Sequence, residues 1–288
     1  MDDNLRFTGV FAATVTPYSG DGSVDSPLAG RLARNLVDSG LAGVCPCGST
    51  GEFPMLSVDE RARVNAAAAE AVGNRGAVVA GVWGWSLAER QALVAAAEKS
   101  GAAAVFLTVP IYFPASESAM VEWYRAVRRM THLPVIAYSI PQFAANEVPV
   151  EALSVLAAEG TIQGFKDSSP DPKRIEAVAS RLRDRLILFA GNESLFAEAL
   201  GMGFGSMISG LANAFPKTVS AVWKREPGAD SRLAAIHKVV REHGGIPAFK
   251  YLSGLRGFPT GPAREPIPPL GDGDRAALDA LFREFGRE

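Results

Sequence analysis

The stretch LPVIAYSIPQFAANEVPVEALSVLAAEGTIQGFKDSS, residues 133–169, holds two short apolar runs that flank a segment with helical spacing. The runs at 133–141 and 161–169 lack the polar alternation of a half-exposed strand, and such runs are typical of strands buried on both faces of a parallel sheet. The range 150–158 can form the crossover helix that two parallel strands require. This stretch therefore predicts a strand–helix–strand unit.

The same order of elements recurs along the chain. Further strands are predicted at 9–17, 43–48, 77–82, 102–110, 185–193 and 205–213. Further helices are predicted at 27–39, 57–72, 86–99, 116–130, 172–180, 195–200 and 216–224. Eight strand–helix units predict the α/β class and a closed (β/α)8 TIM barrel, whose chemistry takes place at the C-terminal strand ends. An open doubly wound sheet is the alternative, but the glycine-rich phosphate loops that usually accompany it are missing from the sequence.

The chain beyond residue 225 follows a different pattern. Helices are predicted at 232–243, 246–255 and 274–285, and the proline-rich stretch RGFPTGPAREPIPPL at 256–270 separates the last two. We therefore predict a barrel catalytic domain over 1–225 and a C-terminal helical extension over 226–288.

Composition argues against several classes of protein. A net charge of −2 gives no sign of nucleic-acid or membrane-surface binding, and no window approaches the ~18 apolar residues of a membrane span. Acidic residues stand at the start of the chain, where a secretory signal would be basic, so we expect a cytoplasmic protein. The spacing of Cys45 and Cys47 suits neither a zinc ribbon nor a structural disulfide. We expect both to be reduced core residues, with a redox role as the alternative.

Lys166 differs from the other six lysines in its position. Those six fall in predicted helices, where a solvated amine is expected: Lys99, Lys173, Lys217, Lys224, Lys238 and Lys250. Lys166 ends the apolar run TIQGF, so a barrel would place its amine at the mouth, within an apolar wall. Burial disfavours the ammonium and should lower the pKa of Lys166, which favours the neutral amine that carbonyl attack requires. A salt bridge from Lys166 to Asp167 or to the neighbouring loop is the structural alternative.

Tyr138 ends the strand before that of Lys166. Residues at corresponding ends of consecutive strands become neighbours, about 5 Å apart. A phenol beside an amine that forms and loses a carbinolamine can shuttle protons, whereas a place in an aromatic packing layer is the alternative.

The loop Gly48-Ser49-Thr50-Gly51-Glu52 follows the second predicted strand. Two hydroxyls and closely spaced N–H groups can bind a carboxylate without an arginine, although a tight turn of small residues has the same composition. Tyr112 adds a hydroxyl after the fourth strand. The three histidines, His132, His237 and His243, lack metal-ligand spacing, so we expect neither a metal nor another cofactor.

Together these motifs resemble a known family. TVTPYSGDGSVD, GSTGEFPMLSVDER, VPIYF, YSIP, GFKDSS and GSMISGLAN follow one another in the order and spacing of the dihydrodipicolinate synthase/N-acetylneuraminate lyase family of class I aldolases. The resemblance covers essentially the full chain. It implies a Schiff-base lysine at Lys166 and a proton-relay tyrosine at Tyr138. Tyr112 matches a tyrosine that crosses from a neighbouring subunit in synthases of the family, and members are usually tetramers, so a homotetramer built as a dimer of dimers is implied.

The resemblance also assigns the carboxylate site. Ser49 and Thr50, which follow Gly48, occupy the two hydroxyl positions of the family's G-T-T-G-E motif. They would bind the carboxylate of pyruvate, and Ser49 would belong to the proton relay.

The substrate side departs from the synthase pattern at Phe143, where dihydrodipicolinate synthases have an arginine that clamps the aldehyde's carboxylate. Phe143 therefore argues against aspartate semialdehyde, because a buried carboxylate without its bidentate partner is costly. Several motifs are similar to those of the 4-hydroxy-2-oxoglutarate aldolase branch and its sugar-acid relatives. Asn192 and Glu193 lie near the place where sialic acid lyases hold sugar hydroxyls, although a turn with a helix N-cap is an equal reading. Ile208 and Ser209, in GSMISGLAN, are further expected substrate contacts.

The leading hypothesis is therefore an aldolase that joins or separates pyruvate and an aldehyde, acting on a 4-hydroxy-2-oxo acid or a 2-oxo-3-deoxy sugar acid. A 4-hydroxy-tetrahydrodipicolinate synthase is the alternative within the family. A hydratase or dehydratase would share the same Schiff base and would differ in its products. A 2-oxo-acid-binding regulatory protein that has lost catalysis is the alternative from another class.

Overall fold

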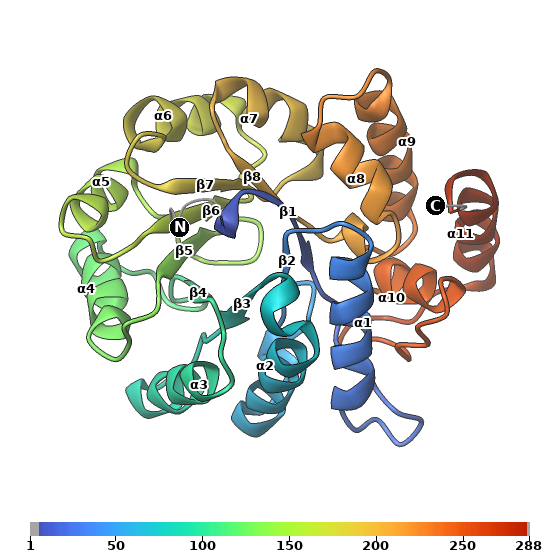
Figure 1. Ribbon diagram of the computed structural model, residues 1–288, viewed down its shortest axis with the longest axis horizontal. Coiled ribbons are helices and arrows are strands. Elements are labelled where there is room, and N and C mark those ends of the chain that lie inside the picture. Colours follow the sequence, from blue (N-terminus) through green and yellow to red (C-terminus); the bar gives the residue numbers. More distant parts are fainter. Residues whose placement is uncertain (1–5, 287–288) are drawn as a thin grey trace.

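Eight parallel strands close into a barrel in the computed structural model, which describes residues 6–286 (Figure 1). The strands are β1 Gly9–Ala13, β2 Gly43–Cys45, β3 Ala77–Gly81, β4 Ala104–Thr108, β5 Val135–Ser139, β6 Gly164–Asp167, β7 Ile187–Ala190 and β8 Ser206–Ser209. Each strand pairs with the next, and β1 pairs with β8. The predicted TIM barrel is confirmed. Each predicted apolar run contains one strand but is longer than it, because neighbouring loop residues, many of them buried, extend the run at one or both ends.

Helices surround the barrel (Figure 1). They are α1 Ser26–Asp38, α2 Val58–Val72, α3 Leu87–Lys99, α4 Glu117–Arg128, α5 Val150–Ala158, α6 Pro172–Leu182, α7 Phe196–Met202 and α8 Pro216–Trp223. Several begin at a residue whose side chain accepts a hydrogen bond from the first turn, as local sequence dictates. Helix α2 begins with a capping box, in which Ser57 Oγ accepts from the Glu60 N–H while Glu60 Oε2 accepts from the Ser57 N–H.

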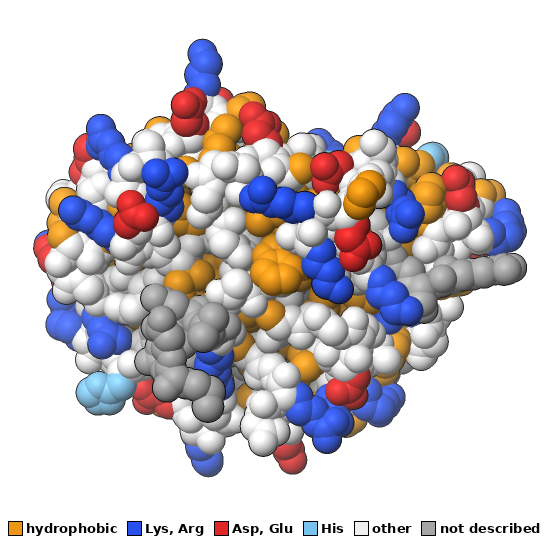
Figure 2. Space-filling view, turned by 45° about the horizontal axis from the view of Figure 1, so that its top comes forward, with side chains coloured by type: hydrophobic (Ala, Val, Ile, Leu, Met, Phe, Trp, Pro, Cys, Tyr) orange, Lys and Arg blue, Asp and Glu red, His pale blue; other side chains and the backbone are white. Residues whose placement is uncertain are grey.

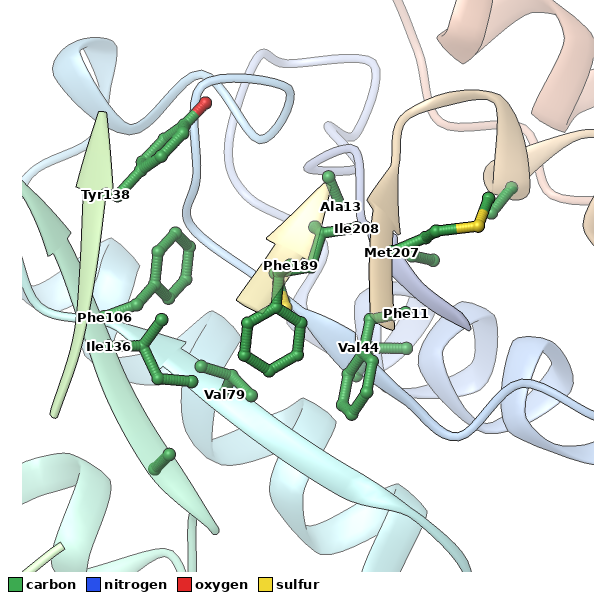
Figure 3. Close-up of a cluster of buried hydrophobic side chains, with 14 of the residues drawn as sticks. Phe11, Ala13, Val44, Val79, Phe106, Ile136, Tyr138, Phe189, Met207 and Ile208 are labelled. Atoms are coloured by element: carbon green, nitrogen blue, oxygen red, sulfur yellow. The ribbon is translucent and has the colours of Figure 1, made fainter. Parts of the chain in front are cut away.

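Large apolar side chains fill the interior of the barrel (Figure 3). The rings of Phe11 and Phe189 meet edge to face, with centroids 5.6 Å apart. Above them, the rings of Phe106 and Tyr138 lie 6.1 Å apart. The barrel is therefore a packed core rather than a pore, and only its C-terminal end can admit a ligand.

Three further helices follow the barrel: α9 Ala229–Glu242, α10 Ile246–Leu255 and α11 Asp272–Phe285. They lie on one side of the ring, next to α8 and α1 (Figure 1). The predicted extension is thus helical, and its treatment as a separate domain from 226 stays a prediction. One expectation for it is wrong: Lys250 is not solvated but only 2% exposed, because α10 turns this residue inward toward the barrel.

The surface carries both signs of charge in close mixture, with no large region of one sign on the face drawn in Figure 2. No helix among residues 6–286 is long and apolar enough to cross a membrane. Cys45 and Cys47 are free thiols in the core, as predicted. Burial raises the pKa of each thiol to about 12, which disfavours the thiolate that redox chemistry needs.

Candidate active site

Tyr138 and Lys166 are register partners on the neighbouring strands β5 and β6. The Lys166 Nζ lies 4.1 Å from the centroid of the Tyr138 ring, and both side chains are almost completely buried. The two residues are therefore neighbours at the C-terminal end of the barrel, as their spacing in the sequence predicts. The alternative of a salt bridge from Lys166 to Asp167 is not what the structure shows. The Asp167 carboxylate instead accepts a hydrogen bond of 2.9 Å from Arg174 Nε.

Gly191, directly after β7, makes room for the Lys166 side chain. A Cβ atom on this residue would lie 2.9 Å from Lys166 Cε and 2.3 Å from Ser168 Oγ. Both distances are shorter than real carbon contacts allow, so any larger residue would displace the lysine or the serine. The glycine thus contributes to the position of the amine.

A cavity of about 340 Å³ opens at these strand ends. Its wall includes eight of the site residues predicted from the sequence: Ser49, Thr50, Tyr138, Phe143, Lys166, Asn192, Glu193 and Ile208. A cavity lined mostly by apolar groups, with a lysine and several hydroxyls among them, has the size and lining of a small-molecule site. The tertiary structure therefore brings most of the predicted residues together.

The Gly48–Glu52 segment is a tight turn whose hydrogen bonds leave Ser49 and Thr50 beside the cavity. The N–H groups of Gly51 and Glu52 donate to the carbonyls of Gly48 and Ser49, each at 3.0 Å. Gly48 itself is not part of the cavity wall, and its carbonyl is used within the turn. The turn thus presents two hydroxyls on a backbone that its own hydrogen bonds hold in place.

Glu193 and Ser209 act as a pair rather than as two separate contacts. Ser209 Oγ donates to Glu193 Oε1 at 3.0 Å, and the Gly210 N–H donates to the same oxygen at 2.9 Å. Ser209 is fully buried and lies outside the cavity wall, behind Glu193. Ser209 was expected to contact the substrate directly, but it does not line the cavity and its hydroxyl is directed at Glu193.

Asn192 both caps a helix and lines the cavity, the two roles that the sequence suggested for it. Its Oδ1 accepts from the N–H and the hydroxyl of Ser194, so the residue caps the short helix η4, Glu193–Leu195. It also forms part of the cavity wall. The cap fixes the side chain and leaves its amide at the edge of the cavity.

Tyr112 lies away from this cavity, in the loop between β4 and α4. Its side chain is 71% exposed and its ring packs against that of Phe113, which is 70% exposed. Within one chain, Tyr112 is therefore not brought to Lys166.

Two residues of α9 that sequence reasoning did not assign to the site, His237 and Arg241, also line the cavity, as do three near the start of α10: Gly245, Ile246 and Phe249. Burial lowers the pKa of His237, while the nearby Glu193 carboxylate opposes this shift and Arg241 adds to it. The amphipathic pattern of α9 indicates that one face is buried, but it does not indicate that two residues of this helix reach the cavity. No local signal in the sequence marks these residues.

A second cavity of about 390 Å³ adjoins the first, and the two share five lining residues: Ser49, Ile140, Phe143, Gly245 and Ile246. Its other lining is mostly apolar and includes Phe53, Met55, Ile111 and Ile267. The exposed side chain of Phe143 therefore lines both the cavity that contains Lys166 and the more apolar cavity next to it.

The chain matches known proteins over nearly its whole length. A family model described as the dihydrodipicolinate synthetase family matches residues 6–284. An uncharacterized DapA-like lyase of Halobacterium salinarum is 36% identical over 293 residues, covering 99% of this chain and 96% of that protein. A 4-hydroxy-tetrahydrodipicolinate synthase of Desulforudis audaxviator is 30% identical over 289 residues, covering 97% of this chain and 98% of that protein. The crystal structure of dihydrodipicolinate synthase from Aquifex aeolicus matches with a TM-score of 0.91 and 26% identity, over 97% of this chain and 98% of that one.

Proposed function

Because this chain belongs to the dihydrodipicolinate synthetase family, we propose that it is a Schiff-base lyase that breaks or forms a carbon–carbon bond between pyruvate and an aldehyde. The observation that carries the proposal is the placement of Lys166 Nζ 4.1 Å from the centroid of the Tyr138 ring, in the wall of a cavity. A buried lysine with a phenol beside it has the two groups that imine chemistry requires: a nucleophile and a proton carrier.

In the cleavage direction, the Lys166 amine adds to the keto carbon of the substrate, and the carbinolamine loses water to give an iminium ion. The bond between C3 and C4 then breaks, and its electron pair passes into the iminium to form an enamine. The C4 hydroxyl loses its proton as it becomes the aldehyde carbonyl. Tyr138 carries protons in these steps, with Ser49 in the relay. Protonation of the enamine at C3 and hydrolysis of the imine then release pyruvate and free the lysine.

The cavity wall supports a 4-hydroxy-2-oxo acid or a 2-oxo-3-deoxy sugar acid as the substrate. Ser49 and Thr50 would hold the carboxylate next to the keto group through hydroxyl and N–H donors. Arg241 supplies a cation that could pair with a second carboxylate, and Asn192 supplies an amide for hydroxyl groups. Phe143, which also lines the cavity, stands where the resemblance places the clamping arginine of dihydrodipicolinate synthases, and this disfavours the synthase alternative.

The proposal includes a homotetramer. Tyr112 and Phe113 are exposed aromatic residues on one loop, and adjacent exposed aromatic rings are typical of surfaces that another subunit covers. In such an assembly Tyr112 would approach the site of a neighbouring subunit, which would account for its distance from the cavity of its own chain.

Borohydride reduction with pyruvate, followed by peptide mass mapping, tests the proposal. The wild type should gain a reduced pyruvate adduct on Lys166, and the Lys166→Met variant should gain none. Cleavage products then separate the remaining alternatives, because an aldolase yields an aldehyde and pyruvate whereas a dehydratase releases only water. A folded wild type without adduct over a range of 2-oxo acids would contradict the proposal and favour a non-catalytic binding protein.

A further inference from the structure

We infer that Lys250 is a positioning residue: from α10, outside the barrel, it holds the turn Gly48–Glu52 from behind and thereby sets how the cavity binds the carboxylate of the 2-oxo acid. This inference rests on the proposed function. It gives the C-terminal extension a part in substrate binding that goes beyond covering the barrel.

The first observation is a buried ion pair between the extension and the end of the turn. Lys250 Nζ donates to Glu52 Oε1 at 3.0 Å. The side chains of Lys250 and Glu52 are 1% and 0% exposed. Burial of two charges is costly, and an apolar pair of similar volume often stabilises a fold as well or better. The pair is therefore better explained by the geometry that it imposes than by its contribution to stability.

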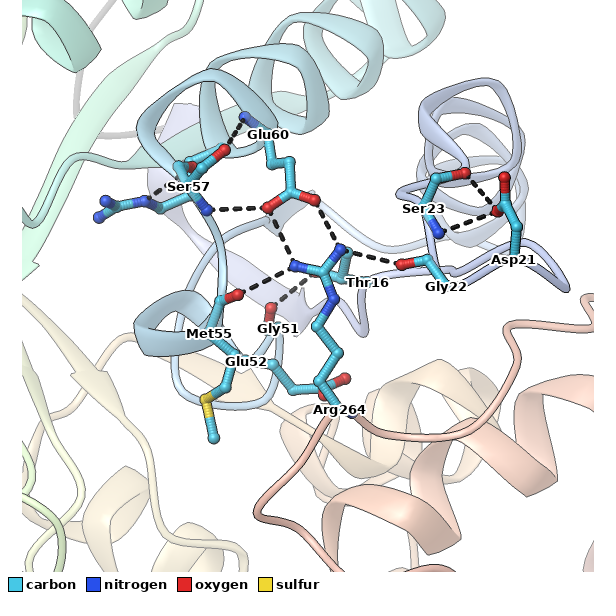
Figure 4. Close-up of polar contacts among 11 residues, drawn as sticks. Thr16, Asp21, Gly22, Ser23, Gly51, Glu52, Met55, Ser57, Glu60 and Arg264 are labelled. Atoms are coloured by element: carbon cyan, nitrogen blue, oxygen red, sulfur yellow. Dashed lines mark hydrogen bonds and ion pairs between the residues drawn. The ribbon is translucent and has the colours of Figure 1, made fainter.

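The second observation is that the ammonium also holds the loop that follows β1, on the other side of the turn. Lys250 Nζ donates to the Thr16 carbonyl at 2.6 Å. The Thr16 hydroxyl in turn donates to the Gly51 carbonyl at 2.6 Å (Figure 4). A single amine thus connects to the turn both at Glu52 and, through Thr16, at Gly51.

The third observation concerns the other oxygen of Glu52. Glu52 Oε2 accepts a hydrogen bond of 2.7 Å from the N–H of Arg264, a residue of the proline-rich stretch 256–270 (Figure 4). Both carboxylate oxygens are therefore bound by the extension. Glu52 itself has φ 59°, in the left-handed region that non-glycine residues rarely adopt, so the end of the turn needs such an external hold.

Tyr18 completes the surroundings of the amine. Its ring lies between two cations, with Lys250 Nζ 3.8 Å and Arg264 Cζ 4.5 Å from its centroid. The pKa of Lys250 is lowered to about 8, mainly by burial; Glu52 opposes this shift, and Arg264 adds to it. The ammonium that holds the turn is therefore the main form at neutral pH, and it loses its proton at mildly alkaline pH.

The consequence for substrate binding follows from the position of Ser49 and Thr50 within this turn. A hydroxyl pair binds a carboxylate well only when the donors are held within about 0.5 Å of the productive geometry. When Lys250 cannot hold Glu52 and Thr16, the turn keeps its internal hydrogen bonds but loses its fixed place against the cavity. Pyruvate binding should suffer more than the later chemical steps, because those depend on Lys166 and Tyr138.

The test compares Lys250→Met with the wild type and with Lys238→Met, a control that makes the same change at an exposed lysine of the adjacent helix α9. Lys250→Met should raise the KM for pyruvate at least about ten-fold while kcat falls less, and Lys238→Met should change neither. In the wild type, KM should rise above a pH of about 8, in step with the loss of the Lys250 proton, and Lys250→Met should lack that rise.

Hydrogen exchange gives a readout that does not depend on turnover. Amides of Gly48–Glu52 should exchange faster in Lys250→Met, while those of the opposite strands β5 and β6 keep their wild-type rates. If Lys250→Met does not fold, the double variant Lys250→Met/Glu52→Gln removes the unpaired buried carboxylate and should be the more stable of the two. It should still show the raised KM for pyruvate.

Two results would overturn the inference, and they differ from each other. A wild type that forms no pyruvate adduct overturns the proposed function and this inference with it. A wild type that forms the adduct, together with a folded Lys250→Met or double variant that has the wild-type KM for pyruvate and wild-type exchange at Gly48–Glu52, overturns this inference alone.

Discussion

Lys166 and Tyr138 lie side by side on β6 and β5, with the lysine Nζ 4.1 Å from the centroid of the tyrosine ring. Parallel pairing in register brings them together, so their relative position depends on the barrel itself and not on a loop. A reactive amine on a rigid strand keeps its geometry through the steps of an imine cycle. The predictions below start from this pair and move outward.

Tyr138→Phe should lower kcat by about 100-fold, the usual contribution of one proton carrier. The ring remains, so the packing against Phe106 should be kept and the free energy of unfolding should change little. Borohydride trapping with pyruvate should still label Lys166, but more slowly. An unchanged kcat for C–C cleavage would show that Tyr138 has only a packing role.

Gly191→Ala should disturb Lys166, because the new Cβ would lie 2.9 Å from Lys166 Cε. We expect the rate of pyruvate trapping to fall at least about ten-fold, as a displacement of about 1 Å near a reacting group can cost more than that. Gly201→Ala on α7 is the matched control, since a Cβ there has no atom within 4 Å. Equal trapping rates in both variants would contradict the steric role of Gly191.

Arg241→Met should raise the KM for anionic aldehydes more than the KM for neutral ones. The KM for glyoxylate should rise about ten-fold through the loss of one charge-assisted contact, while the KM for glyceraldehyde should stay within about two-fold. Arg232→Met, an exposed arginine of the same helix, should leave both values unchanged. If the two aldehydes lose affinity equally in Arg241→Met, the arginine has no part in recognising a carboxylate.

Glu60→Gln should reduce stability at neutral pH but not in acid. Hydrogen bonds from Arg264 hold the pKa of Glu60 at about 2, below its unfolded value of 4.5. A carboxyl whose pKa is lowered on folding adds stability above the unfolded pKa and loses it as pH falls toward the folded pKa. Because solvent screens this partly exposed pair, we expect a loss of about 1 kcal/mol at pH 7, shrinking between pH 4.5 and 2. Urea unfolding across this range tests it, with Glu70→Gln on the same helix as the control, and a difference independent of pH would contradict it.

Much of the fold could be predicted because it follows from patterns among residues that are close together in the sequence. The capping box at Ser57 and Glu60 involves residues three apart, and both of its hydrogen bonds are present. The helix expected at 150–158 has those bounds. Burial on both faces makes each strand a continuous apolar run, and this run can be recognised in the sequence without knowing which strands lie next to it.

The candidate site was predictable where it follows from strand register and was missed where it depends on packing. Tyr138 and Lys166 end consecutive strands, so their adjacency follows from the closed sheet. His237 and Arg241 enter the cavity wall only because α9 packs beside α8 in one particular orientation. The direct substrate contact expected of Ser209 also left packing out of account, because its hydroxyl is directed at Glu193 instead of the cavity.

By itself, the sequence determined the barrel, its strand ends and the lysine–tyrosine pair, because apolar periodicity and parallel register are set by residues close together in the chain. Only the tertiary structure decided that Lys250, on a helix more than 190 residues from Glu52, is buried against it. A helical pattern fixes which residues share a face, but the surface that this face meets depends on the packing of the whole extension against the barrel. For that reason the sequence predicted a solvated lysine where the fold contains a buried ion pair.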